Sequence, residues 1–421
     1  MRRTAILGGV LAVLTGGAGW CQAQEWPQWA GPARNWTSDT PETAGVFQKG
    51  TLGLKLAWKR PLAAGEEGIS ALTVHGDRLY SLSSTNGNAH AFALDAATGK
   101  EVWRVPVGTV PPDQEFGAAS TPATDGRRVY VVSPTCVLSA LDAADGKTVW
   151  SRDFKTDFAN KVATGCWNSP LLEGNLVIAQ VNGDPDKRVV AFDKGSGEVV
   201  WSAAGTVKSA LPSPALFDFG GVRQVLVHES QKGQGGLYGL RLQDGALLWT
   251  ARFEDPESYS FDTPIAMPGG RIAVVGWSDF RVAQVRATQE KDKPGADQLW
   301  KSREIRAEVQ PFTSHAVYHG EHLYGFGGEN LVCLDAATGK TVWREKVYPG
   351  SLILVDGHLV VLSQAAGLLR VVEATPAGYR EKARLEVFTP GAPTDTPPSF
   401  AGRRVYLRNS EEIAAVEVTS R

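Results

Sequence analysis

Residues 94–103 read LDAATGKEVW, and this stretch decides the fold because the chain repeats it. Each strong copy has an Asp, a Gly four residues later and a Trp four residues after the Gly. Further strong copies lie at 141–150, 192–201 and 334–343. The aromatic residues that end the strong and weak copies, our predicted repeat anchors, are Trp58, Trp103, Trp150, Trp201, Trp249, Trp300, Trp343 and Phe388. Neighbouring anchors are 43 to 51 residues apart, a period typical of propellers and solenoids.

Each repeat predicts four short β-strands, which we call A to D in chain order. Strands A and B form an apolar hairpin around a Gly turn, as in ALTVHGDRLYSLSS at 71–84. Strand C ends at the Asp, the turn reverses at a Gly such as Gly99, and strand D carries the Trp. A sheet this small cannot bury both faces alone. We therefore expect radially packed sheets, with the Trp between neighbouring blades.

The two ends of the chain complete each other. Residues 54–58 supply a D strand with no A, B or C strand before it, whereas residues 399–418 supply strands A to C with no D strand after them. Pairing these ends removes a free sheet edge. We predict an all-β fold for residues 51–421, an eight-bladed β-propeller of four-stranded antiparallel blades, closed by the N- and C-terminal strands. An open solenoid is the alternative.

The first 23 residues have the pattern of a secretory signal peptide, with Arg2 and Arg3 before an apolar stretch that ends near Trp20. Two alternatives are a membrane anchor and a lipidated Cys21, which would make the protein membrane-associated. Export to the periplasm or outside the cell is predicted. Residues 24–50 form a second segment, and its tryptophans are expected to pack on the propeller: Trp26, Trp29 and Trp36.

The charge balance excludes several classes of partner. Lys and Arg number 43 and Asp and Glu 45, with no basic block, which argues against nucleic acid and against an anionic membrane surface. No apolar run after the signal is long enough to span a bilayer. Among the remaining cysteines, Cys333 is interpreted as a small core residue, and Cys136 and Cys166 could form a disulfide, although their spacing does not decide it.

The repeat A-x-D-x-x-T-G-K-x-x-W resembles the PQQ-like repeat of quinoprotein alcohol dehydrogenases, best at 93–103, 140–150 and 333–343. The same repeat builds BamB-like outer-membrane assembly lipoproteins, and WPQWAGP at 26–32 resembles the leader of exported propellers of this type. The resemblance implies the fold more than the function. It leaves a non-catalytic binding scaffold, a PQQ-dependent dehydrogenase and a BamB-like assembly factor as hypotheses, and we favour the scaffold.

The resemblance also implies what an enzyme of the family would need. Such enzymes hold PQQ between a Trp and a disulfide of adjacent cysteines, beside calcium, but this chain has no adjacent Cys pair and no CxxCH motif. We therefore expect no cofactor and no catalytic residue, and PQQ with calcium is disfavoured. His315, His319 and His322 cluster on one hairpin, but an alternating strand does not bring three metal ligands together, so no metal site is predicted.

The D–A and B–C connections should lie on one face, which we call the loop face, and they are longer than the turns opposite. We expect this face to bind a protein, peptide or carbohydrate, because aromatic residues mixed with carboxylates and amides suit such contacts. Capping of the blade ends is the alternative role. The candidates are Glu66, Glu67, Phe116, Trp167, Asn168, Tyr259, Phe261, Asp262, Trp277, Asp279, Gln310, Phe312, Glu329 and Asn330.

Overall fold

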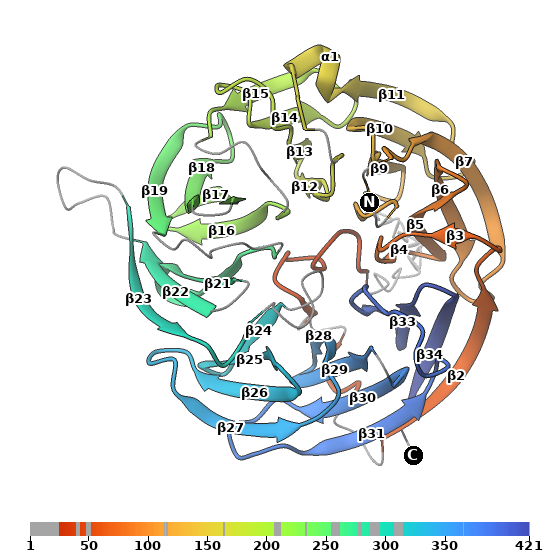
Figure 1. The fold of residues 1–421 in the computed structure, drawn as a ribbon, viewed down its shortest axis with the longest axis vertical. Helices are drawn as coiled ribbons and strands as arrows, with labels where there is room; N and C mark the ends of the chain where they lie inside the picture. The colour runs from red at the N-terminus through yellow and green to blue at the C-terminus, as the bar shows by residue number, and fades with distance from the viewer. Residues whose placement is uncertain are drawn as a thin grey trace, which may run out of the picture.

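The apolar residues of each repeat form eight small antiparallel sheets that stand around a common axis (Figure 1). The fold was analysed in a computed structural model. It describes residues 25–38, 43–47, 52–112, 114, 117–162, 165–205, 212–231, 234–253, 262–276, 280–285, 295–306, 315–364 and 366–420. Within these residues the predicted all-β, eight-bladed propeller is confirmed.

In each blade the strands run in order from the innermost to the outermost. Blade 1 is β4 (Thr73–His75), β5 (Arg78–Thr85), β6 (Asn88–Asp95) and β7 (Glu101–Thr109), with β3 (Glu66–Glu67) added beside β5; blade 2 is β8 (Ala123–Thr124), β9 (Arg128–Val132), β10 (Val137–Asp142) and β11 (Thr148–Asp153); blade 3 is β12 (Leu171–Glu173), β13 (Leu176–Gln180), β14 (Val189–Asp193) and β15 (Val199–Ala203); blade 4 is β16 (Ala215–Phe219), β17 (Val222–Gln231), β18 (Gln234–Arg241) and β19 (Leu247–Phe253).

The second half of the ring has the same order. Blade 5 is β20 (Ile265–Met267), β21 (Arg271–Val275), β22 (Phe280–Val285) and β23 (Ala296–Ser302); blade 6 is β24 (Ala316–His319), β25 (His322–Gly327), β26 (Asn330–Asp335) and β27 (Thr341–Lys346); blade 7 is β28 (Gly350–Val355), β29 (His358–Ser363), β30 (Leu368–Glu373) and β31 (Glu381–Glu386), with β1 (Thr37–Ser38) beside β28; blade 8 is β32 (Ser399–Ala401), β33 (Arg404–Arg408), β34 (Glu412–Ser420) and β2 (Leu52–Pro61). Two short helices, α1 (Phe154–Phe158) and η1 (Pro268–Gly270), lie between strands.

Blade 8 takes its strands from both ends of the chain, as predicted. Strand β2 pairs antiparallel with β34, with Leu54 opposite Val418 and Trp58 opposite Ala415. In Figure 1 the orange β2 lies along the outside of the blue β34 and closes the circle. The ring is therefore held by a ladder of backbone hydrogen bonds rather than by a covalent link.

The recurring Trp and Gly meet across five of the blade boundaries in the described part of the chain. Gly99, in the turn of blade 1, has a φ of 71°, and a Cβ placed on it would lie 2.6 Å from the ring of Trp58 in blade 8. The indole Nε1 of Trp58 donates to the carbonyl of Ala96 in the same turn, at 3.0 Å. Both the backbone conformation and the neighbouring ring thus require Gly here. The same Trp–Gly pairing joins Trp103 with Gly146, Trp150 with Gly197, Trp201 with Gly245 and Trp300 with Gly339.

Phe388 does not take the position of the repeated Trp, and this anchor was wrong. In blade 7 the pairing register places Ala383 opposite Val371, where Trp343 stands opposite Cys333 in blade 6. Phe388 lies beyond the end of β31 and is buried in the core. The reason is the ring closure: six of the repeated Trp residues donate to a carbonyl in the C–D turn of the next blade. Blade 8 has no such turn, because its outermost strand comes from the other end of the chain.

A disulfide joins Cys136, in the B–C turn of blade 2, to Cys166, in the loop before blade 3. The structure thereby decides the pairing that the spacing left open. Cys333 is buried in strand β26, as expected of a small core residue. Asp95 accepts hydrogen bonds from the backbone N–H and the hydroxyl of Thr98, at 2.8 and 2.6 Å, so this carboxylate holds the turn.

Candidate functional site

The beginning of the described chain fills the centre of the ring. Residues 25–38 and 43–47, here called the axial segment, form the red trace that crosses the middle of Figure 1. Trp26 pairs through its backbone with Val74 in blade 1, and β1 pairs in parallel with β28 in blade 7. Trp26 and Trp36 are only 2% and 1% exposed, and Trp29 packs half-buried against the same core. These tryptophans are core residues rather than an exposed binding surface.

The axial segment contacts every one of the eight blades. Besides blades 1 and 7, its partners are Pro27 with Thr124 in blade 2, Gln28 with Leu172 in blade 3, Arg34 with Pro214 in blade 4, Trp29 with Thr263 in blade 5, Trp36 with His315 in blade 6 and Phe47 with Phe400 in blade 8. The segment therefore acts as a hub around which the blades are arranged.

Arg34 is the deepest charged group of the hub, with 1% of its surface exposed. Its guanidinium donates to the carbonyls of Pro170 at 2.9 Å, Pro214 at 2.7 and 2.9 Å, and Ser169 at 3.3 Å. Burial lowers the pKa of Arg34 to about 9, so it keeps its charge at neutral pH. The three carbonyls precede the innermost strands of blades 3 and 4, which places Arg34 at the loop-face end of the axis.

From there the axial segment returns to the opposite face, where the A–B and C–D turns lie; we call it the turn face. Asp356, in the A–B turn of blade 7, accepts backbone hydrogen bonds from Gly45 at 3.0 Å and Phe47 at 2.9 Å. The ring of Phe47 lies 5.4 Å from that of His358. A single carboxylate thus fixes the point where the segment leaves the axis.

The centre of this propeller is filled by its own chain. The axial segment occupies it with the side chains of Arg34 and Trp36, and Cys136 pairs with a cysteine 30 residues away rather than with a neighbour. Among the described residues no group of three His, Cys, Asp or Glu side chains could hold a metal ion. The expectation that no cofactor binds stays a prediction, and no chemical step is derived from one.

The three histidines near the blade 6 hairpin lie in separate environments. His315 is buried against Trp36, and its ring nitrogen contacts the carbonyl of Leu352. His322 Nδ1 contacts the carbonyl of Gly320 at 2.6 Å. His319 lines a pocket on the turn face. Their spacing along the strand reflects the hairpin register and not a shared ligand.

Several predicted loop-face residues are buried. Glu66 is 4% exposed and forms an ion pair with Arg104 at 3.2 Å, and Asn168 donates from Nδ2 to the carbonyl of Gln180 at 3.1 Å. Asp262 is 2% exposed, and burial raises its carboxyl pKa well above the usual range. These three side chains are buried at the blade ends and are not accessible to a partner.

Others do lie at the surface of the loop face. Glu67 and Glu329 are exposed, and Trp167 and Asn330 are half-buried. Glu329 forms an ion pair with Lys346 at 2.9 Å. The remaining candidates fall outside the described residues: Phe116, Tyr259, Phe261, Trp277, Asp279, Gln310 and Phe312. For those seven residues a role in binding on the loop face stays a prediction.

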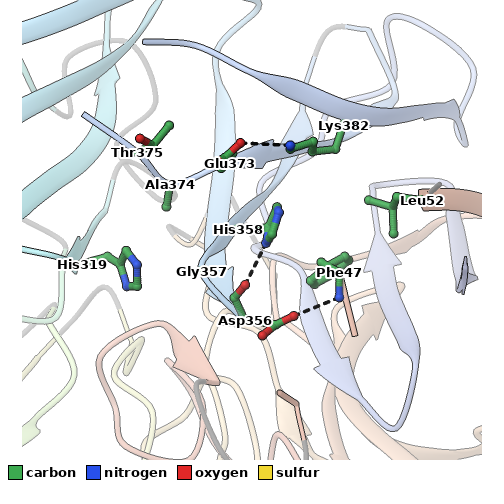
Figure 2. Close-up of a pocket in the computed structure, with 10 residues that line it drawn as sticks. All are labelled: Phe47, Leu52, His319, Asp356, Gly357, His358, Glu373, Ala374, Thr375 and Lys382. Atoms are coloured by element: carbon green, nitrogen blue, oxygen red, sulfur yellow. Dashed lines mark hydrogen bonds and ion pairs between the residues drawn. The ribbon is translucent and has the colours of Figure 1, made fainter. Parts of the chain in front are cut away.

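A pocket of about 650 Å³ lies on the turn face, between blade 7, the axial segment and the start of β2. Figure 2 shows Asp356, Gly357 and His358 among its lining residues, with Lys382 and Glu373 joined by an ion pair. The remaining lining residues are Phe47, Leu52, His319, Ala374 and Thr375. The sequence analysis placed no site here, because the pocket combines segments more than 300 residues apart.

Arg34 was also missed. The only sequence signal is an Arg inside the Trp-rich stretch 26–36, where a charged side chain between buried aromatic residues must find hydrogen-bond acceptors.

In the part of the chain that the structure describes, no helix has the length and apolar character needed to cross a membrane.

Comparisons with known proteins identify the relatives of this chain. The family model described as outer membrane protein assembly factor BamB matches residues 87–291 and 283–420. BamB of Yersinia pestis is 27% identical over 276 residues, which cover 62% of this chain and 65% of that protein, slightly under two thirds of its length. BamB of Burkholderia pseudomallei is 25% identical over 366 residues, or 85% of this chain and 86% of that protein.

Among solved structures, the quinohemoprotein alcohol dehydrogenase of Comamonas testosteroni superposes with a TM-score of 0.67. The match has 15% sequence identity and covers 94% of this chain and 81% of that one. At such low identity the likeness shows a shared propeller fold and carries no information about activity.

Proposed function

Because the chain belongs to the family of the outer membrane protein assembly factor BamB, we propose that it is an exported, non-catalytic scaffold that binds a protein partner during outer-membrane protein assembly. The family match extends over nearly all blades, from residue 87 to residue 420. Location in the cell envelope is supported by the signal-like first 23 residues and by the disulfide between Cys136 and Cys166, a bond typical of oxidising compartments.

The observation that carries the proposal is the filled axis. The axial segment contacts all eight blades and places Arg34, Trp29 and Trp36 on the axis of the ring. A propeller whose centre is taken by its own chain offers its faces and rim to other molecules. A rigid ring with surface loops suits the holding of a protein better than the turnover of a substrate.

The loop face is the surface we assign to the partner. It carries exposed Glu67 and Glu329 and the half-buried indole of Trp167. Trp is among the residues that dominate binding energy at protein interfaces when a partner covers them. The neighbouring disulfide at Cys166 holds the loop that presents Trp167, so little ordering is needed on binding.

The test uses the bacterium that carries the protein. Deleting the gene should lower the amount of folded barrel protein in the outer membrane, and the intact gene should restore it. A photo-crosslinking residue at position 167 should capture a component of the outer-membrane assembly machinery. The same residue at position 247, an exposed site on the rim, serves as the control and should capture it poorly.

Two results would contradict the proposal. Unchanged outer-membrane proteins in the deletion strain would exclude a role in assembly. Oxidation of alcohols or sugars by the purified protein, supplied with PQQ, Ca²⁺ and an artificial electron acceptor, would instead support the dehydrogenase hypothesis.

A further inference from the structure

We propose that the turn-face pocket of about 650 Å³ binds a neutral saccharide. The pocket lies on the face opposite the one assigned to the protein partner, and the inference does not depend on the assembly role. It rests on three properties of the lining: compensated charges, hydrogen-bonding groups of both kinds, and an apolar patch (Figure 2).

The pocket lies where the repeat is interrupted. Ala383 occupies the Trp position of blade 7, and blade 8 has no C–D turn, because β2 supplies its outermost strand. Lys382, the neighbour of Ala383, and Leu52, at the start of β2, both line the pocket. The site therefore belongs to the boundary at which the ring closes.

The charged groups of the lining are compensated within the protein. Lys382 forms an ion pair with Glu373 at 2.9 Å, and Arg380 lies 3.8 Å from the same carboxylate. Asp356 accepts hydrogen bonds from two backbone N–H groups of the axial segment, at 3.0 and 2.9 Å. An anion would meet the carboxylates of Glu373 and Asp356, and a cation would meet Lys382. The lining therefore favours a ligand without charge.

The same groups place hydrogen-bond donors and acceptors side by side. The side chains of Lys382 and Glu373 are 43% and 30% exposed, so a ligand can reach both partners of the ion pair. The hydrogen bond from Lys382 lowers the pKa of Glu373, which keeps this carboxylate ionised as an acceptor at neutral pH. The Thr375 hydroxyl accepts from the backbone N–H of Ala377 at 3.2 Å, and its own O–H can donate.

A sugar matches this arrangement because each of its hydroxyls is both a donor and an acceptor. Adjacent hydroxyls can donate to Glu373 and accept from Lys382 and Thr375 at the same time. The side chains of Phe47, Leu52 and Ala374 supply an apolar patch against which the C–H face of the sugar ring can pack. The pocket volume lies within the range of small-molecule sites and accommodates one or two sugar rings.

Methyl glycosides of glucose, galactose and mannose are the probes, and cyclohexanol and glucuronate are the comparison ligands. Cyclohexanol keeps a six-membered ring without adjacent hydroxyls, and glucuronate adds a negative charge. Ligand-observed NMR titration of the full-length protein measures binding at pH 8, where an ordinary imidazole carries no charge. We expect saturable binding of at least one methyl glycoside and weaker binding of both comparison ligands. Salt should change glycoside binding little, because a neutral ligand is not subject to charge screening.

Substitutions test the position of the site. Thr375→Val removes the hydroxyl and should weaken glycoside binding about fivefold, whereas Thr375→Ser keeps the hydroxyl and should bind like the wild type. Lys382→Met keeps the aliphatic stem, removes the ammonium donor and should weaken binding by a similar factor. Lys346→Met is its matched control, because Lys346 forms an ion pair of the same length, 2.9 Å, with Glu329 at the loop-face end of blade 6.

Four results would overturn the proposal. The first two are the absence of saturable binding for all three methyl glycosides, and binding of cyclohexanol or glucuronate as strong as that of the best glycoside. The other two are equal effects of Lys382→Met and Lys346→Met, and equal effects of Thr375→Val and Thr375→Ser, since either would place the bound sugar outside this pocket.

Discussion

The indole of Trp36 lies face to face with the imidazole of His315, with ring centroids 3.7 Å apart and planes inclined by 14°. His315 comes immediately before β24 in blade 6, and its ring nitrogen contacts the carbonyl of Leu352 in blade 7. One stacked pair thus ties the axial segment to two blades. The ring of His315 therefore packs within the hub. This structural role accounts for one of the three histidines that lie close together in the sequence.

Substituting Arg34 should destabilise the whole ring. Arg34→Ala leaves the buried carbonyls of Pro170 and Pro214 without donors, and we expect the free energy of unfolding to fall by about 3 kcal/mol. Denaturant unfolding followed by tryptophan fluorescence measures this. Arg127→Ala, at an exposed position, should change it by less than about 0.5 kcal/mol. Similar effects of both substitutions would mean that the hub does not stabilise the fold.

The repeated Trp should contribute far more to the free energy of unfolding than the apolar residue before it. Trp103 is 8% exposed and donates to the carbonyl of Ala143 at 3.0 Å, whereas Val102 is 40% exposed. Trp103→Ala should cost about 3–5 kcal/mol and Val102→Ala less than about 0.5 kcal/mol, in chemical denaturation. Trp103→Phe keeps most of the packing and should cost an intermediate amount. A small loss for Trp103→Ala would argue against the Trp as the link between blades.

The disulfide should contribute measurably to stability. Cys136 and Cys166 close a loop with a sequence separation of 30, for which the loss of chain entropy in the unfolded state predicts about 3–4 kcal/mol. Thermal unfolding of the wild type with and without a reducing agent, beside a variant in which both cysteines are replaced by Ser, measures this contribution. The reducing agent should leave the double variant unaffected. A shift of equal size in that variant would show that the reductant acts elsewhere.

Acidification should destabilise the protein through His228. Burial lowers the pKa of this side chain to about 4, with an opposing backbone hydrogen bond at Asp262 and a further lowering by Arg281. Because the folded-state pKa lies below the unfolded value of about 6.5, the unfolded state binds the proton first. Stability is therefore full above pH 6.5 and is lost as the pH falls from about 6.5 to 4, by about 3 kcal/mol.

His228→Asn should remove this part of the pH dependence. Comparing denaturant unfolding of the variant and the wild type at pH 7.5 and pH 4.5 isolates the histidine from the other titrating groups. His322→Asn, at the half-buried start of β25, is the control and should keep the wild-type slope. An unchanged slope in His228→Asn would show that another group controls the acid sensitivity.

The blades could be predicted from the sequence because each repeat contains the short pattern of residues that defines its own turns. The Gly of the C–D turn is required by a positive φ, and the Asp bonds its own turn, so both can be recognised from a few neighbouring residues. Phe388 shows where this reasoning fails. It was aligned by spacing with the Trp positions, but the register gives that place to Ala383, since the ring closure removes the turn on which a Trp would pack.

The candidate site could be predicted only in part. Glu67 and Glu329 are exposed on the predicted face, but Asn168 and Asp262, which belong to other loops of that face, are buried. Loop assignment from the sequence gives the face of the propeller on which a residue lies. It does not tell whether the side chain points outward or into the seam between two blades.

By itself the sequence determined the eight blades, the closure of the ring by its two ends and the place of Trp and Gly at the blade boundaries, because these depend on a short periodic pattern. Only the tertiary structure decided what fills the axis and where a pocket forms. Arg34 finds its carbonyl acceptors beside blades 3 and 4. Phe47 and Lys382, more than 300 residues apart in the chain, line the same pocket. Contacts of this kind follow from how the ring closes in space, and no local pattern encodes them.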